Sequence, residues 1–404
     1  MKAAAKTLQA IFLPWLDIGR RRYRLRHGTL LGYQVGNPPK GISSTEASLF
    51  EHALSVFRGR GGTDLTNVAL FKRNGAQAFD TVEEVAASEV FRELELLKFS
   101  ALLERDLLRP GWRGYCNSDG FMVRSARCPS VATGMVFEYR RAIGRAIDLG
   151  PVTDHQVHVW PHVDAPQDLS AGVSMLRSIW AYIDNQGAKR ANKVLDAAYC
   201  YGEANTDSDL ASRFAEFVML SSAFESFVDA GSVSAEVFAK KAATFLPISG
   251  GKGRSEFERE MDGKAYRAVA SGPEISYRNV MEIWLREFHT IRGIVAHGHR
   301  RAQLPRKTTW TPGEHLAIAR VVFPLVVKVA LSRAGVRVLS RRERVEVRAI
   351  PAIVAQEDPG FGDRNGYAQK ILDEIESRAS RDGKVRFMRE VRRRERVADA
   401  SGGD

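Results

Sequence analysis

Apolar residues recur three or four positions apart along most of residues 166–345, a spacing that places them on one side of a helix. The clearest stretch spans residues 276–297. Ser276 is a suitable N-cap and Gly298 a suitable stop. Its apolar positions alternate in steps of four and three: Tyr277, Met281, Trp284, Phe288, Ile291 and Val295. The pattern predicts a helix that is buried along one side.

The same spacing predicts further helices in this part of the chain. They span residues 169–184, 188–201, 207–228, 235–245, 256–268 and 314–333. Asp207 or Ser208 is a suitable cap for the third of these. Apolar-striped helices joined by moderate loops favour an antiparallel bundle, which we place at residues 166–345.

The N-terminal part has a mixed pattern. Short runs rich in β-branched and aromatic residues, bounded by Gly, Pro or Asn, predict strands at 29–35, 67–71, 120–124, 134–139 and 156–160. The apolar spacing predicts a helix at residues 81–108. The apolar N-terminal stretch is predicted to form a first strand or turn. The predicted fold class is therefore α+β, with a mixed domain at residues 1–165 followed by the all-α bundle.

The remaining residues, 346–404, alternate charge with short apolar pieces. They predict a basic, partly helical tail, with helices at 367–375 and 384–397. Such a tail is either solvated or in contact with nucleic-acid phosphates.

Composition agrees with a globular protein of more than one domain: 404 residues, 44% hydrophobic and 27% charged. The net charge of +12 favours a polyanionic partner, with nucleic acid ahead of an anionic membrane surface. Three cysteines without metal-ligand spacing favour a reducing, cytoplasmic location.

Two apolar stretches superficially resemble a signal peptide or a membrane span, but neither has the features of one. The N-terminal stretch contains Pro14 and runs into Asp17 without a small-residue cleavage site. The later run, residues 318–331, is interrupted by Arg320, Pro324 and Lys328. We expect no membrane partner.

The helix predicted at 276–297 ends in polar residues that are unusual at the end of a buried helix. Arg292 stands in its last turn, His297 follows five residues later, and Gly298 comes next. An Arg and a His at this spacing, at the end of an apolar helix and before a Gly, resemble the signature of HEPN domains. The segment FHTIRGIVAHG, residues 288–298, is most similar to the Apea-like branch.

This resemblance covers about residues 170–340 and implies a function. Many HEPN proteins are dimeric, metal-independent endoribonucleases of toxin–antitoxin and antiviral defence systems. By resemblance, Arg292 and His297 form the catalytic pair. The segment SAFESF matches the family pattern at Ala223 and Glu225, which implies that Glu225 steadies Arg292. An antitoxin or another defence protein would be a partner, and the N-terminal domain would be a sensor or targeting part.

One position departs from the family pattern: the residue after the Arg is usually polar in active members, and here it is Gly293. Inactive HEPN domains that dimerise or bind nucleic acid also exist. A non-enzymatic binding module is therefore the alternative function.

The chemistry of RNA cleavage suits these residue types. RNA carries its own nucleophile, the 2′-hydroxyl, and cleavage needs proton transfer and charge stabilisation at the phosphate. Histidine suits the proton transfers and arginine suits phosphate oxygens, so no metal or cofactor is required. Five residues rotate an ideal helix by about 500°, so Arg292 and His297 do not share a face. They converge only through the helix end or across two copies, which agrees with a homodimer.

Basic residues beside the pair and in the tail are candidates for contacts with RNA. They are His299, Arg300, Arg301, Arg392, Arg393 and Arg394. The stretch RRRYRLRH, residues 20–27, alternates basic and aromatic residues, and is either a nucleic-acid contact or a solvated strand.

Two other patterns point to different chemistry. His155, His158 and His162 lie close in sequence and suggest a third class, a metal-dependent hydrolase, although no Cys or dense carboxylate cluster accompanies them. The glycine-rich segments 57–62 and 249–255 lack the full phosphate-loop spacing and read as flexible turns.

Overall fold

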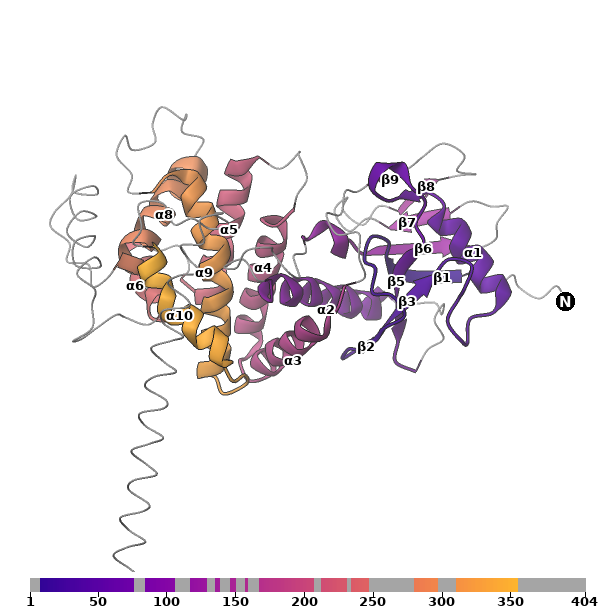
Figure 1. The fold of residues 1–404 in the computed structure, drawn as a ribbon, viewed down its shortest axis with the longest axis horizontal. Helices are drawn as coiled ribbons and strands as arrows, with labels where there is room; N and C mark the ends of the chain where they lie inside the picture. The colour runs from indigo at the N-terminus through magenta and orange to yellow at the C-terminus, as the bar shows by residue number, and fades with distance from the viewer. Residues whose placement is uncertain are drawn as a thin grey trace, which may run out of the picture. The chain divides into compact units, whose positions relative to one another are not determined.

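The computed structural model describes eleven segments of the chain. They are residues 8–75, 84–105, 117–128, 135–138, 146–149, 157–158, 167–206, 212–230, 234–246, 280–296 and 310–354. The chain divides into two compact units: residues 1–106 with 113–229, and residues 107–112 with 230–404. Figure 1 shows the fold as a ribbon, coloured from indigo at the N-terminus to yellow at the C-terminus.

The first unit contains a seven-stranded antiparallel sheet in the order β2-β3-β5-β1-β6-β7-β8. Its strands are β1 (Leu8–Leu13), β2 (Arg22–Arg24), β3 (Gly28–Gln34), β5 (Asn67–Arg73), β6 (Arg124–Cys128), β7 (Met135–Glu138) and β8 (Ala146–Leu149). The short strands β4 (Phe57–Arg58) and β9 (Val157–His158) pair with each other in parallel. Together with the helices below, this sheet confirms the α+β class.

Helix α1 (Ser44–Leu54) covers one face of the sheet. Strand register places Phe12 opposite Leu70 and Tyr33 opposite Val68, so alternate residues of these strands point to that face. Phe50 of α1 packs edge-on against Phe12 and Tyr33, with ring centroids 5.2 and 4.9 Å apart. Alternate residues of β1 and β5, among them Phe12 and Leu70, therefore enter one core with Phe50 beneath the helix.

Two carboxylates fix the turns beside this sheet. Glu93 of α2 (Glu84–Leu103) is fully buried and accepts the backbone N–H groups of Arg26 (2.5 Å) and His27 (2.8 Å). Burial raises the pKa of Glu93, even though the two N–H groups oppose that shift. Glu51 of α1 similarly accepts the Tyr33 hydroxyl (2.9 Å) and the N–H of Gly36 (2.8 Å). Each carboxylate thus accepts backbone N–H groups that the hydrogen bonds of the sheet leave unpaired.

Helices α3 (Ser170–Asp184), α4 (Ala188–Glu203) and α5 (Arg213–Val228) belong to the same unit as the sheet. Helix α2 lies against α3 and α4, and α4 lies against α5 (Figure 1). A Cβ added at Gly172 of α3 would lie 3.2 Å from the Cα of Ala101, so the glycine permits close packing on α2. Because these helices pack on the N-terminal half, the boundary falls after Asp229 rather than near residue 165.

The second unit contains α6 (Ala235–Ala243), α8 (Val280–Ala296), α9 (Pro312–Arg333) and α10 (Arg341–Val354). Helix α8 packs against α6, and α10 contacts both α8 and α9 (Figure 1). A capping box at Thr311 and Glu314 starts α9. Among the described residues, α9 alone is long and apolar enough to span a membrane, yet 83% of its most apolar window is buried within the protein. That burial is what a core helix shows.

Several predicted elements need correction. Residues 119–121 form a short 3-10 turn, so the strand expected at 120–124 begins only at Arg124. Helix α5 begins at Arg213 with Ser212 as its cap, not at Asp207 or Ser208. Helix α10 crosses the expected start of the tail at residue 346. The helices predicted at 256–268, 367–375 and 384–397 lie outside the described residues.

Candidate functional site

Helix α8 carries Arg292 just before its last turn, which comprises residues 293–296, because the described helix ends at Ala296. The predicted stripe is buried at four positions, Met281, Trp284, Phe288 and Ile291. Val295 is half-buried, and Tyr277 lies outside the described residues. Arg292 follows the last fully buried stripe position and is itself half-buried. The helix therefore brings the guanidinium to the edge of its buried surface.

Burial on α8 is wider than one stripe. Val280, Ile283 and Leu285 are buried as well, so the first part of the helix is enclosed on more than one side. His289, one turn before Arg292, stacks on Phe238 of α6 with ring centroids 4.9 Å apart. This histidine packs between helices.

Gly293, which departs from the family pattern, is not required by packing. A Cβ added there meets no atom within 4 Å, and its φ lies outside the left-handed region that favours glycine. A polar residue therefore fits this position without displacing its described neighbours.

Glu225 stands in the last turn of α5, half-buried between the fully buried rings of Phe224 and Phe227. It belongs to the first unit, whereas Arg292 belongs to the second. The predicted contact between these two side chains stays a prediction.

The other predicted site residues lie outside the described part of the chain: His297, His299, Arg300, Arg301, Arg392, Arg393 and Arg394. Of the three histidines suggested as metal ligands, His158 is on β9, and His155 and His162 are outside the described residues. Within the described segments, no group of three or more His, Cys, Asp or Glu side chains is placed to hold a metal ion. The glycine-rich segment 57–62 contributes β4 and a short turn in which Gly61 and Gly62 are left-handed.

Sequence reasoning missed a buried polar pair in the second unit. His315, on the first turn of α9, is fully buried, and its Nε2 lies 3.1 Å from Oε1 of Glu287 on α8. The same carboxylate oxygen accepts the N–H of Trp310 (3.1 Å). Rings of Trp284, Phe288 and Trp310 lie within 6.3 Å of the imidazole.

Burial lowers the pKa of His315, and this effect outweighs Glu287 and Glu314, which both favour protonation. Burial therefore favours the neutral imidazole, and the tautomer with its proton on Nε2 donates to the carboxylate. A fully enclosed ring has no route to a substrate. This pair joins α8 to the start of α9, on the helix that carries Arg292.

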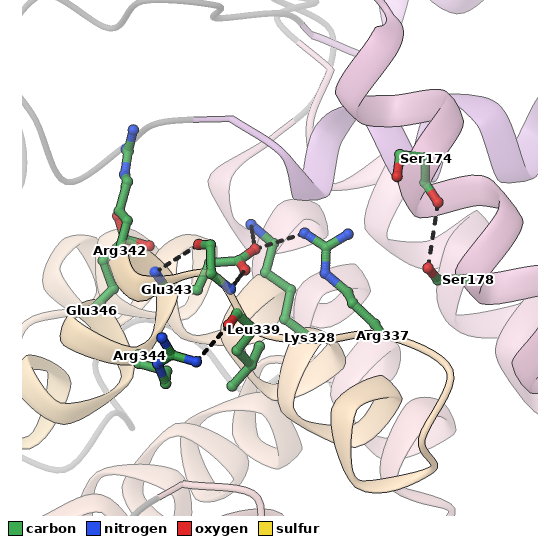
Figure 2. Close-up of polar contacts among 10 residues, drawn as sticks. Ser174, Ser178, Lys328, Arg337, Leu339, Arg342, Glu343, Arg344 and Glu346 are labelled. Atoms are coloured by element: carbon green, nitrogen blue, oxygen red, sulfur yellow. Dashed lines mark hydrogen bonds and ion pairs between the residues drawn. The ribbon is translucent and has the colours of Figure 1, made fainter. Parts of the chain in front are cut away.

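A second polar cluster joins α9 to α10 (Figure 2). The Glu343 carboxylate lies 3.3 Å from Nζ of Lys328 and accepts a hydrogen bond from Arg337 at 2.7 Å. It also accepts the N–H of Ser340 at 2.8 Å. Burial would raise the pKa of Glu343, but Lys328, Ser340 and Arg337 together lower it to about 2. The carboxylate is thus ionised at any ordinary pH.

Comparison with protein-family models, with curated proteins and with solved structures gives no match.

Proposed function

We propose that this chain is a metal-independent endoribonuclease of the HEPN type, acting in the cytoplasm as a toxin or antiviral defence effector. The observation that supports the proposal best is α8 itself. A helix anchored by buried aromatic rings carries a half-buried Arg292 near its C-terminal end, five residues before His297 in the sequence. A guanidinium and an imidazole together supply the charge stabilisation and proton transfer that phosphodiester cleavage needs.

In the proposed reaction, the RNA 2′-oxygen loses its proton to a base and attacks the adjacent phosphorus. The bond from phosphorus to the 5′-oxygen breaks, and that oxygen takes up a proton. The products carry a 2′,3′-cyclic phosphate and a 5′-hydroxyl. His297 serves the proton transfers, and Arg292 stabilises charge on the non-bridging oxygens. Glu225 orients Arg292, and two copies of the chain form the site.

A second candidate function is a dimerisation and nucleic-acid-binding module without catalysis. Gly293 favours it, because active members of the family that the sequence resembles usually carry a polar residue there. Packing leaves room at this position, so the Gly293→Asn variant is a direct comparison: it restores a polar side chain without a clash among the described residues.

The test is incubation of the purified protein with end-labelled RNA in EDTA, followed by end-group analysis. The wild type is expected to cut and to leave 2′,3′-cyclic phosphate. His297→Ala is expected to reduce the rate by about 100-fold or more, the usual effect of losing a general acid or base. Thr290→Ala, at an exposed position of the same helix, is the matched control and should retain the wild-type rate.

Equal cleavage by the wild type and by folded His297→Ala would reject the catalytic assignment. RNA binding without cleavage, by wild type and Gly293→Asn alike, would favour the binding module.

A further inference from the structure

A basic pocket opens on the sheet of the first unit, on the face that α1 covers. Its volume is about 260 Å³. It is lined by strands β2, β3 and β5, by the loop before α1 and by the turn after β5. The cationic residues that line it are Arg22, Lys40, Lys72 and Arg73.

Strand register explains why cations distant in sequence meet here. Thr29 of β3 pairs with Lys72 of β5 on one side and with Arg24 of β2 on the other, so their side chains share a face. Arg22 lies two residues from Arg24 and points the same way. Lys40 comes from the loop that precedes α1.

The charge of this pocket is not neutralised within the described residues. No Asp or Glu lines it. The side chains of Arg22, Lys40, Lys72 and Arg73 form no hydrogen bond or ion pair with the described part of the chain. Other surface cations of this unit do find acidic partners, for example Arg26 with Asp184 at 2.9 Å. Like charges gathered without a carboxylate repel one another, and an anion removes that repulsion.

Protection of a sheet edge accounts for only part of this cluster. Charged residues on edge strands discourage pairing with another chain, and β2 is an edge strand. Lys72, however, lies on β5, which has strand neighbours on both sides, and Lys40 lies in a loop. These two lysines need another explanation.

We propose that this pocket binds the phosphodiester backbone of single-stranded RNA. The Thr29 hydroxyl in the wall adds a hydrogen-bond donor for phosphate and sugar oxygens. Phosphate contacts give affinity that depends on salt and not on sequence. The choice of RNA as the polyanion rests on the proposed function, whereas the binding of phosphates rests on the pocket alone.

The experiment measures binding of a short labelled single-stranded RNA by fluorescence anisotropy, in EDTA, between about 50 and 200 mM salt. All proteins carry His297→Ala, so that the RNA stays intact. The test variant is Arg22→Gln with Lys72→Gln. The matched control is Arg177→Gln with Lys189→Gln, two exposed cations on helices of the same unit, which removes the same charge.

The pocket variant is expected to bind about ten-fold more weakly. Its plot of log affinity against log salt should flatten by about 1.4, because each lost contact with single-stranded phosphate changes the slope by about 0.7. The control should stay within about two-fold of the parent. Equal weakening of both variants, or of neither, would overturn the proposal. So would a pocket variant that keeps RNA affinity but loses binding to phosphatidylserine vesicles.

The two proposals fail separately. Pocket-dependent binding without cleavage by the wild type rejects the nuclease and keeps the pocket. Cleavage with pocket-independent binding keeps the nuclease and rejects the pocket.

Discussion

At the scale of single residues, buried or partly buried carboxylates of this chain accept backbone N–H groups that the strand and helix hydrogen bonds leave unpaired. Glu93 holds the turn between β2 and β3, Glu51 holds the end of β3, and Glu287 holds Trp310 just before α9. A buried carboxylate is costly unless such donors satisfy it. The positions of these acids are therefore set by the backbone around them.

The buried His315 makes the stability of the second unit depend on pH. Its pKa is lowered in the folded state, so the unfolded chain binds a proton more readily. Stability is then fully present above the unfolded pKa of about 6.5 and falls as the pH decreases below it. The loss is at most about 1.4 kcal/mol per pH unit for one proton. Thermal unfolding between pH 7.5 and 5 measures this slope.

The comparison for this prediction is His315→Gln, whose amide can still donate to Glu287 but does not titrate. At pH 7.5 the variant should unfold at a lower temperature, because the aromatic packing around the ring is lost. The difference in unfolding temperature between the variant and the wild type should shrink toward pH 5. A deficit that stays constant across this range would mean that His315 does not titrate differently in the two states.

At the scale of elements, Glu343 links α9 to α10. The pKa of Glu343 is lowered in the folded state. Its contribution to the stability of the second unit is therefore present above the unfolded pKa of about 4.5 and is lost as the pH falls through about 2. Glu343→Gln should therefore destabilise the second unit at pH 7 by about 3 kcal/mol, and the difference from wild type should close between about pH 4.5 and 2. Urea unfolding at a series of pH values measures it.

Glu346→Gln is the control on the same helix. Glu346 accepts a hydrogen bond from Arg342 at 2.7 Å, but the Arg342 side chain is 42% exposed, and such pairs contribute about 0.5 kcal/mol or less. Equal losses of unfolding free energy in the two variants would show that the contacts of Glu343 with Lys328 and Arg337 stabilise the protein no more than a partly exposed ion pair does.

Several elements lie where the sequence predicts them. Strands β3 and β5 were found from their β-branched and aromatic residues, and helices α3, α4 and α6 from their apolar spacing of 3.6 residues. Helix α1 was missed although Ser43 and Glu46 form a capping box, because its apolar stripe is short. Helix α10 was missed because its buried residues, such as Val345 and Ile350, alternate with charges that are themselves held in ion pairs.

At the scale of the whole molecule, pattern reasoning reached Arg292 because one helix carries it. It did not reach the pair of His315 with Glu287, whose members are 28 positions apart, or the basic pocket, whose cations come from two strands and a loop. Pairing of strands and packing of helices create these sites, and neither is visible in a local pattern.

The boundary between the two units also depends on packing that no local sequence pattern reveals. Contacts that cross residue 165 tie the sheet to the helices: the Tyr23 hydroxyl donates to Asp168 at 3.1 Å, and Phe99 packs edge-on against Tyr201 at 5.8 Å. A fragment of residues 1–165 would expose the face of α2 that α3 and α4 cover.

We therefore expect a fragment of residues 1–229 to fold and residues 1–165 to fail. Circular dichroism during thermal unfolding is the measurement. The longer fragment should melt in one cooperative transition, and the shorter one should aggregate or melt without one. A shorter fragment with a cooperative transition at the same temperature would mean that α3 to α5 add nothing to the stability of the sheet. The boundary would then return to residue 165, and the helices up to Val228 would stand as part of a separate bundle.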